Sequence, residues 1–236
     1  MASLQHAVLE ALEGARNYNA WIASLALPYL GEDPLEIGSG TGTFAAAWLE
    51  AGVSKLTVSE VDQDLIEKLR QRFADDARVS VRALDVLEAV EAEHSCAVAL
   101  NVLEHIADDV AGLRGAARLV RPAGAIVLFV PAFPFAMSRF DRAIGHYRRY
   151  TAKTARAAFV AAGLTVEEIR YVNAPGLVAW TFGMRLLGLT PRDGMVLRAW
   201  DRAVIPPTRG LERRWRPPFG QSLLIAGSAA AGSDGP

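Results

Sequence analysis

The sequence predicts a doubly wound α/β fold, in which a seven-stranded, mostly parallel sheet carries an α-helical insertion before its last strand. Two observations support this prediction. Short apolar runs alternate with segments of helical periodicity from residue 34 to residue 172. A glycine-rich turn also follows the first apolar run and leads into a helical pattern. Strands separated by helices pair in parallel through right-handed crossovers, so helices should cover both faces of the sheet.

The elements follow one another regularly along the chain. Strands are predicted at 34–37, 55–60, 78–83, 96–101, 124–130, 164–172 and 221–227, and helices at 42–51, 63–73, 108–120 and 151–162. Thr151 is suited to begin the last of these helices and Gly163 to end it. An earlier helical period at 4–27 is interrupted near Gly14, and we expect Pro28 to end it.

Composition limits the classes of protein that the chain can represent. With 236 residues, of which 51% are hydrophobic, it can build one well-buried domain plus an insertion. A net charge of −1 argues against a nucleic-acid partner held by a global positive field. The single cysteine, Cys96, excludes an internal disulfide, and we find no secretory signal and no apolar run long enough to cross a membrane. We therefore expect a cytoplasmic protein, monomeric or homodimeric, and the excess of arginine and alanine suggests a GC-rich bacterial genome.

Three segments are expected. Residues 1–172 together with 221–228 form the main domain, 173–220 form the insertion, and 229–236 form a disordered tail. The insertion holds eight arginines and three acidic residues, which gives it a charge of +5 and leaves −6 for the rest of the chain. We interpret it as one or two helices that cap an acceptor pocket. Its interleaved Arg and Trp residues equally suit dimerisation or peripheral contact with a membrane surface.

The most informative stretch is 34–44, PLEIGSGTGTF. Three alternate glycines let a strand turn sharply into a helix and let the backbone approach a ligand closely. The spacing lacks the later glycine of the dinucleotide fingerprint, and Glu36 precedes it. A pyrophosphate requires a bare helix N-terminus, whereas a nearby carboxylate suits a cofactor with a cationic amino-acid end. Such a turn can also serve packing alone.

Two further carboxylates follow neighbouring strands. Glu60 lies at the end of the strand 55–60, and Asp85 occupies the corresponding position after 78–83. A carboxylate at the carboxyl end of a strand can accept hydrogen bonds from a ribose diol. Together with the glycine turn, these two residues outline a crevice shaped for a nucleoside.

These motifs together resemble class I S-adenosylmethionine-dependent methyltransferases. The motifs are Glu36-x-Gly38-x-Gly40-x-Gly42, then Glu60, then Asp85, then Asn101-Val102-Leu103-Glu104-His105. The chain resembles in particular the small-molecule O-methyltransferase branch typified by ubiquinone-biosynthesis enzymes. The resemblance covers roughly residues 15–172, and 221–227 fits as the last strand of that fold.

The resemblance implies a set of cofactor-binding residues for S-adenosylmethionine, whose product is S-adenosylhomocysteine. The glycine turn with Glu36 and Ser39 would hold the methionine moiety, under Tyr18 of the preceding helix. Glu60 and its neighbour Val61 would bind the ribose, Asp85 and Val86 the adenine, and Asn101 would lie beside the sulfonium. Core packing is an equal explanation for Tyr18.

Four histidines are available as bases or ligands, and we expect His6 and His94 to face solvent. His105 follows Glu104 at the end of the fourth strand. In the ubiquinone branch, and in small-RNA 2′-O-methyltransferases, an acidic residue three positions before this Glu-His pair completes a divalent-metal site. Asn101 stands there in this chain and is a poorer ligand, so we expect no metal. The alternative for Glu104 and His105 is that they cap the following helix and orient loops.

His146 lies in Gly145-His146-Tyr147-Arg148-Arg149-Tyr150, just before the helix 151–162. A similar segment precedes this helix in bacterial members of the branch. We expect His146, with His105 as a second candidate, to deprotonate an acceptor hydroxyl, and Tyr147, Arg148, Arg149 and Trp180 to contact the substrate. Alternatively, the two arginines pair with carboxylates and Tyr150 packs.

The predicted function is S-adenosylmethionine-dependent methyl transfer to a small molecule, most readily at oxygen. The apolar content of the insertion favours an apolar or aromatic acceptor with an anionic group. Three alternatives stay open. They are transfer to nitrogen or carbon, including on a lipid- or glycan-linked intermediate; an NAD-linked oxidoreductase, which the glycine spacing and Asp85 disfavour; and a cofactor-binding module without catalysis.

Overall fold

The computed structural model describes residues 13–186 and 194–229. Its seven strands form one sheet in the order β3-β2-β1-β4-β5-β7-β6, and β7 is the strand that runs antiparallel to both of its neighbours. The strands are β1 Pro34–Ile37, β2 Leu56–Glu60, β3 Val79–Ala83, β4 His94–Leu100, β5 Val120–Pro131, β6 Thr165–Val172 and β7 Ser222–Ser228. The predicted doubly wound, mostly parallel sheet is therefore confirmed.

The four helices predicted between strands are present as α3 Thr43–Glu50, α4 Gln63–Arg72, α5 Asp109–Arg118 and α7 Ala152–Ala161. α2 Arg16–Ala26 lies in the second half of the predicted period at 4–27, and α6 Arg139–Ala143 was not predicted. Short turns are η1 Leu27–Tyr29, η2 Val86–Glu88, η3 Leu103–His105 and η4 Pro134–Ala136. This first described helix, α2, ends at Ala26, within two residues of the predicted end at Pro28, and Pro28 lies in the short turn η1 that follows. Thr151 caps α7 as expected, and its hydroxyl accepts a hydrogen bond from the Thr154 amide.

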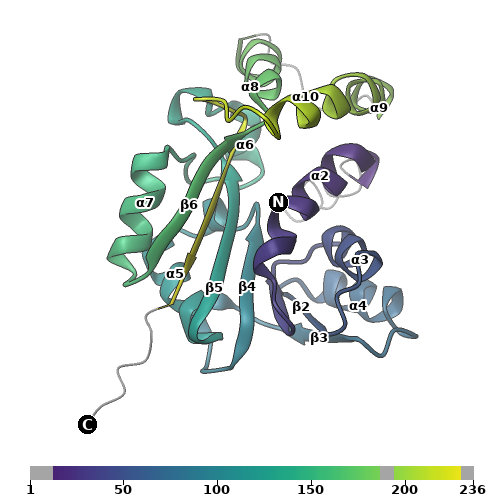
Figure 1. Cartoon of the computed structure of the whole chain (residues 1–236), viewed down its shortest axis with the longest axis vertical. Helices are drawn as coiled ribbons and strands as arrows, with labels where there is room; N and C mark the ends of the chain where they lie inside the picture. Colours follow the sequence, from purple (N-terminus) through teal and green to yellow (C-terminus); the bar gives the residue numbers. More distant parts are fainter. Residues whose placement is uncertain (1–12, 187–193, 230–236) are drawn as a thin grey trace.

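Helices lie on both faces of the sheet (Figure 1), and two hydrophobic clusters hold them there. Trp21 of α2 and Trp48 of α3 lie in the first cluster, and the indole nitrogen of Trp48 donates to the Ala23 carbonyl oxygen at 3.0 Å. Leu113 of α5 and Phe159 of α7 lie in the second, on the opposite face. The layers position the carboxyl ends of the parallel strands at one open edge, where ligands bind in this class of fold.

One histidine differs from its expected position. His94 begins β4 and is buried, with Nδ1 3.3 Å from the Asp33 carbonyl oxygen, so it does not face solvent. His6 lies outside the described residues. Cys96 is buried in the middle of the sheet with a free thiol, as expected, and burial raises its pKa to about 12.

The insertion between β6 and β7 is helical, as predicted. It contains α8 Ala174–Trp180, the π-helical turn η5 Thr181–Leu186, α9 Gly194–Ala203 and α10 Ile205–Glu212. These helices lie beyond the carboxyl ends of the strands, and α9 and α10 lie beside each other and against α2 (Figure 1). No helix in the described parts of the chain is both long and apolar enough to span a membrane. Of the predicted disordered tail, only Ala229 is described, and its amide donates to Gly124.

Candidate cofactor and catalytic site

The glycine turn between β1 and α3 uses the left-handed backbone conformation three times. The φ angles of Gly38, Gly40 and Gly42 are 67°, 55° and 80°. A Cβ atom on Gly38 would lie 2.7 Å from Cγ2 of Val102, which follows β4. Glycine is therefore required at residue 38 both by its dihedral angle and by the close approach of two strand ends.

Glu36 is buried directly beneath this turn. Burial raises the pKa of its carboxyl group to about 8, against a smaller opposite effect of Ser39. One of its carboxylate oxygens has no hydrogen-bond partner among the described residues. Its backbone carbonyl oxygen accepts a hydrogen bond from the Ser59 hydroxyl at 2.7 Å, which ties β1 to β2. An unpartnered buried carboxyl group at this point is suited to a cationic ligand.

Glu60 at the end of β2 reaches across to the glycine turn. Its carboxylate accepts hydrogen bonds from the Gly40 amide at 3.0 Å and the Val61 amide at 2.8 Å. A carboxylate has about four acceptor positions, so capacity remains for two hydroxyl groups. The side chain of Val61 is 61% exposed beside it. The predicted neighbourhood of Glu60 and the glycine turn is thus present.

Asp85 and Val86 follow β3 and have different surroundings. The Asp85 carboxylate is exposed and accepts a hydrogen bond from the Leu87 amide at 2.9 Å. The side chain of Val86 is buried in the second hydrophobic cluster and packs toward Gly115 of α5. Contact between Val86 and a cofactor therefore requires its backbone, whereas the Asp85 side chain is open to solvent.

Asn101 and Tyr18 also lie at the carboxyl edge. Asn101 follows β4 with a φ of 57°, a conformation that asparagine tolerates better than most residues, and its side chain is exposed. Tyr18 of α2 is half-buried, and desolvation raises the pKa of its hydroxyl group to about 12, with smaller effects of Ser222 and Arg149. The cofactor roles predicted for these residues stay predictions.

His146 belongs to a buried hydrogen-bond network centred on Asp141. Nδ1 of His146 lies 3.0 Å from Oδ1 of Asp141, which also accepts from Nη2 of Arg149 at 2.8 Å. The other oxygen accepts from the Ser138 hydroxyl at 2.7 Å. Burial alone would raise the pKa of Asp141, but the hydrogen bonds from His146 and Arg149 hold it well below its usual range. The network therefore places a permanent negative charge against one nitrogen of His146.

Glu104 and His105 face His146 from the end of β4. Burial raises the pKa of Glu104 to about 8, and neither of its carboxylate oxygens has a hydrogen-bond partner among the described residues. The rings of His105 and His146 meet edge to face with centroids 4.6 Å apart, and burial followed by the charge of His146 lowers the pKa of His105 to about 4. The alternative that these two residues cap the next helix is not supported, because Asp108 caps α5.

These three residues also fit a divalent cation. Glu104, His105 and His146 each offer one ligand atom, and the atoms lie within 4.8 Å of one another. The two unpartnered oxygens of Glu104 and the unpartnered Nδ1 of His105 are the groups that a cation would satisfy. In the sequence, Asn101 stands in the place of the third ligand and no metal is expected, whereas the fold brings His146 to Glu104 and His105 instead.

The predicted substrate contacts are mostly engaged within the protein. Arg149 is buried, pairs with Asp141 and lies over the Trp180 ring at 4.7 Å from its centroid. Arg148 pairs with Asp109 at 2.9 Å, and Tyr147 alone of the four is largely exposed. The alternative pairing of both arginines with carboxylates is what the structure shows. Trp180 donates to the Ala136 carbonyl oxygen and is half-buried.

The central role of Asp141 in this network could not be predicted from the sequence. The spacing Ser138-x-x-Asp141 is a recognisable helix-capping pattern, and the structure forms this capping box at the start of α6. The pattern would have located the cap. It would not have shown that the same carboxylate binds His146 and Arg149, because those contacts depend on the return of the chain after α6.

Comparisons with known proteins identify part of the chain as similar to a known domain. Residues 35–126 match a family model described as a methyltransferase domain. A ribosomal RNA small subunit methyltransferase A from Prochlorococcus marinus (strain MIT 9303) is 45% identical over 53 residues, which are 22% of this chain and 19% of that protein. An uncharacterised 37.1 kDa protein in transposon TN4556 of Streptomyces fradiae is 29% identical over 127 residues, 52% of this chain and 37% of that protein. The matched part of this chain thus spans well under half of the length of these relatives.

Solved structures share the fold over most of the chain. A putative methyltransferase in complex with the Trm112 methyltransferase activator of Haloferax volcanii has a TM-score of 0.67 at 18% identity. The aligned region covers 99% of this chain and 97% of that protein's chain. A geranyl diphosphate methyltransferase in complex with SAM has a TM-score of 0.63 at 14% identity, with 89% and 85% covered. The fold is that of class I methyltransferases. The matched domain supports the predicted S-adenosylmethionine-dependent methyltransferase.

Proposed function

We propose that this protein transfers a methyl group from S-adenosylmethionine to an oxygen atom of a small-molecule acceptor, with His146 as the general base. The observation that carries the proposal is the 3.0 Å contact between Nδ1 of His146 and Asp141. A carboxylate at this distance keeps the proton on Nδ1, so Nε2 is left as the basic nitrogen. Transfer to nitrogen or carbon has no need of such an oriented base.

The cofactor cradle is the second support. S-adenosylmethionine would supply a methyl group on a sulfonium sulfur and leave as S-adenosylhomocysteine. Glu36 would bind its ammonium group from beneath the glycine turn, and Glu60 would accept hydrogen bonds from its ribose hydroxyls. Glu36 is buried with an unpartnered oxygen, and Glu60 is already fixed by the Gly40 amide, so neither needs to reorganise on binding.

His146 would take the proton of the acceptor hydroxyl at Nε2 as the oxygen forms its bond to the methyl carbon. Asp141 stabilises the resulting imidazolium, because its own charge is maintained by Arg149 and Ser138. Alignment of the acceptor and exclusion of water supply the remaining acceleration. His105, whose pKa is about 4, stays neutral near pH 7 and does not compete as a cation.

A divalent cation is a second way to activate the acceptor oxygen at the same place. Glu104, His105 and His146 would hold it, and it would lower the pKa of a bound hydroxyl group. Two imidazoles and one carboxylate favour zinc, manganese or iron over magnesium. This arrangement supports the finer resemblance to the ubiquinone-biosynthesis branch, in which a Glu-His pair contributes to a metal site.

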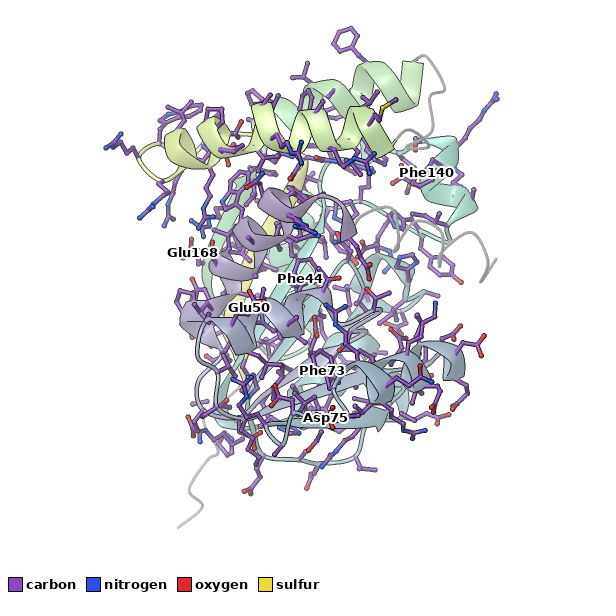
Figure 2. The ribbon with its side chains drawn as sticks, turned by 90° about the vertical axis from the view of Figure 1, so that its right-hand side faces the viewer. Phe44, Glu50, Phe73, Asp75, Phe140 and Glu168 are labelled. Carbon is purple, nitrogen blue, oxygen red and sulfur yellow. The ribbon has the colours of Figure 1, made fainter. Side chains whose placement is uncertain are left out.

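The acceptor is proposed to be a small molecule with an apolar or aromatic body. Phe135 and Tyr147 are 51% and 61% exposed near the carboxyl edge, and Phe140 meets Trp180 edge to face at 6.1 Å (Figure 2). Arg148 and Arg149 are committed to carboxylates, so their role toward an anionic group of the acceptor is the weaker part of the proposal. A cytoplasmic monomer or homodimer remains our expectation.

Calorimetric titration tests the cofactor first. We expect heat with S-adenosylhomocysteine and none with NADH; the reverse result would replace this proposal with an oxidoreductase. Methyl transfer to a panel of phenols, alcohols, carboxylic acids and amines then tests the acceptor. Cofactor binding without turnover on any of them would favour a binding module.

Two variants separate the base from the metal. With a base alone, His146→Ala should lower kcat about a hundredfold or more and His105→Ala only slightly. With a metal, both variants should lose activity, and EDTA should abolish the activity of the unmodified protein until zinc or manganese is restored. Unchanged rates in both variants, with cofactor binding intact, would rule out both roles and favour transfer to nitrogen or carbon.

A further inference from the structure

Exposed apolar side chains are concentrated on the helical insertion. Seven of the thirteen large hydrophobic side chains exposed in the described parts of the chain lie between residues 173 and 220. They are Val178, Phe182, Met195, Val196, Leu211, Trp215 and Phe219, with exposures from 41% to 76%. Scattered exposed hydrophobic residues are normal on a protein surface, whereas a concentration of this kind marks an interaction site.

The described part of the insertion exposes arginines without exposed acids. Arg198, Arg202, Arg213 and Arg214 are exposed, and none of them has an ion pair with another described residue. The two described acids of the insertion both face inward. Asp201 is buried against α2, and Glu212 accepts hydrogen bonds from the amides of Asn173 and Ala174. The outer surface therefore combines apolar groups with uncompensated positive charge.

Helical spacing separates an inner from an outer side. On the inner side, Trp200 packs against the first hydrophobic cluster and Ile205 is buried in it. Met195, Ala199 and Arg202 of α9 recur at the i, i+4, i+7 positions of one exposed side. Pro207 and Leu211 of α10 are exposed at i, i+4, and the exposed Arg214 lies in the turn that follows α10. The two helices run across the top of the molecule, away from the sheet (Figure 2).

We propose that the outer surface of the insertion, formed by α8, η5, α9, α10 and the segment from Arg213 to Phe219, docks on an anionic lipid membrane. Apolar side chains enter the boundary between headgroups and acyl chains, while arginines remain with the phosphates and tryptophan favours the same depth. The charge distribution fits such a partner, because the insertion carries +5 and the rest of the chain −6. The net negative remainder would be repelled from the membrane, so attraction also orients the molecule.

The arrangement favours a membrane over the other macromolecular partners. The centre of a protein interface is depleted of charged residues, whereas arginines are interleaved with the apolar side chains here. A nucleic acid would meet the arginines but leave residues such as Met195 and Leu211 without an apolar partner. In the docked orientation, the carboxyl edge of the sheet lies behind the insertion and faces the bilayer (Figure 1).

A cleft beside α10 offers a place for a lipid phosphate. Its volume is about 200 Å³, and Asn17, Arg209 and Arg213 contribute the polar groups while Ile205, Pro206 and Gly210 complete its lining. None of these residues belongs to the glycine turn or to the histidine cluster. The cleft is lined mainly by α10, so it belongs to the same basic segment.

The experiment is co-sedimentation of the full chain with vesicles. We expect binding to vesicles of 70% phosphatidylcholine and 30% phosphatidylglycerol, weak binding to pure phosphatidylcholine, and a marked decrease when the salt is raised from about 0.1 to 0.5 M. Arg213→Glu with Arg214→Glu should weaken binding about tenfold or more. Phe182→Ser with Trp215→Ser should weaken it to a similar degree, since both side chains lose apolar burial.

A matched control is provided by α7, on another side of the molecule. Lys153, Arg156 and Val160 are exposed there at similar helical spacing, so Lys153→Glu with Arg156→Glu, and Val160→Ser, should leave vesicle binding unchanged. Circular dichroism and calorimetric titration of S-adenosylhomocysteine check that each variant is folded. Membrane docking is read independently of cofactor binding, so failure of one leaves the other standing.

Three results would overturn the proposal. The first is equal binding of the insertion variants and the α7 controls. The second is a dimer that Phe182→Ser with Trp215→Ser converts to a monomer, without any vesicle binding by the unmodified chain. The third is binding of an RNA oligonucleotide that depends on Arg213 and Arg214 while anionic vesicles are ignored. The first result would show that the insertion does not carry the membrane contact, and the other two would assign this surface to a second copy of the chain or to a nucleic acid.

Discussion

Two buried carboxyl groups, Glu36 and Glu104, dominate the electrostatics of the carboxyl edge. Burial raises the pKa of each to about 8, and each has an oxygen without a described partner. Proteins retain such groups at a cost in stability, which makes them candidates for function. Asp141, by contrast, is hydrogen-bonded through both oxygens and stays ionised. The site therefore combines one carboxylate with a permanent charge and two carboxyl groups, Glu36 and Glu104, whose charge depends on pH.

Glu36→Gln should make the protein more stable at alkaline pH and weaken cofactor binding. The folded-state pKa of about 8 lies above the usual value of 4.5, so the unmodified protein loses stability as the pH rises from about 4.5 to 8. The variant lacks this loss, and its advantage at pH 9 should be a few kcal/mol, on the order of 1.4 per pKa unit. Urea unfolding at pH 5 and pH 9 measures it.

The same variant should bind S-adenosylmethionine at least about tenfold more weakly, because the buried charge is the partner of the ligand's ammonium group. Glu50→Gln, at an exposed position at the end of α3, is the control for the charge change. A stability difference that is equal at both pH values would show that Glu36 is ionised in the folded protein without cost.

Asp141→Asn should strongly reduce activity while the backbone around the site stays largely unchanged. An amide cannot hold the proton on Nδ1 of His146 as a carboxylate does, so kcat should fall about a hundredfold or more with little change in KM. The pH profile of kcat should shift, which a loss of packing alone would not produce. The substitution also leaves the buried Arg149 without its charged partner, which should lower the free energy of unfolding by about 3–5 kcal/mol. Rates are therefore compared at a temperature where both proteins are folded.

Asp109→Asn is the comparison for that experiment. Asp109 of α5 pairs with Arg148 and accepts a hydrogen bond from the Tyr150 hydroxyl at 3.0 Å. It therefore binds the segment that contains His146 without an ion pair or hydrogen bond to His146 itself. It should affect stability and leave the pH profile of kcat unchanged. A similar profile shift in both variants would remove the special role of Asp141.

Among the elements, the turn between β1 and α3 imposes the tightest geometric demand. Gly38 combines a positive φ with close approach to Val102, whereas Gly52 has a φ of 98° and no atom within 4 Å of an added Cβ. The two positions therefore separate backbone strain from crowding. Crowding at Gly38 acts on the point where the β1 and β4 ends meet, which is also the junction of the cofactor cradle and the histidine cluster.

Gly38→Ala should destabilise the protein by more than Gly52→Ala and should alone impair cofactor binding. Backbone strain costs both variants about 1 kcal/mol, and a 2.7 Å contact adds about 1–3 kcal/mol at Gly38. Thermal unfolding and calorimetric titration measure the two effects. Val102→Ala in the same chain should recover part of the loss; no recovery would mean that the contact with Val102 is not the cause.

Across the whole molecule, the insertion is joined to the N-terminal helix by a cap supplied from a distant part of the chain. Ala15 precedes α2 and provides no capping side chain. Asp201 of α9 takes this role, and its carboxylate accepts hydrogen bonds from the Asn17 amide at 2.9 Å and the Tyr18 amide at 2.8 Å. The insertion thereby holds α2, the helix that carries Tyr18.

Asp201→Ala should loosen this junction. Loss of the cap should lower the free energy of unfolding by about 1–2 kcal/mol and should increase amide exchange in both α2 and α9, measured by mass spectrometry. Asp108→Ala removes the local cap of α5 and should cost a similar amount, with faster exchange in α5 alone. Faster exchange confined to α9 in the first variant would show that α2 does not depend on the insertion.

Most of the scaffold could be predicted because its signals are local. Apolar periodicity and turn residues located every strand of the sheet within a few residues, and the spacing from Glu36 to Gly42 located the cofactor turn. These features depend on neighbours in the sequence and on the chemistry of one turn. Asp85 and Glu60 were placed correctly at strand ends for the same reason, since parallel strands share an edge.

The contacts that define the candidate site could not be predicted from the sequence, because they join residues that are far apart in it. His146 reaches Glu104 and His105 across about 40 residues, and Asp201 caps a helix that lies 183 residues earlier. The sequence around Arg149 predicts a substrate contact, whereas its buried surroundings in the structure are those of a residue that stabilises the fold. Burial and partner choice arise when the sheet brings distant segments together, and they depend on three-dimensional packing that no local pattern encodes.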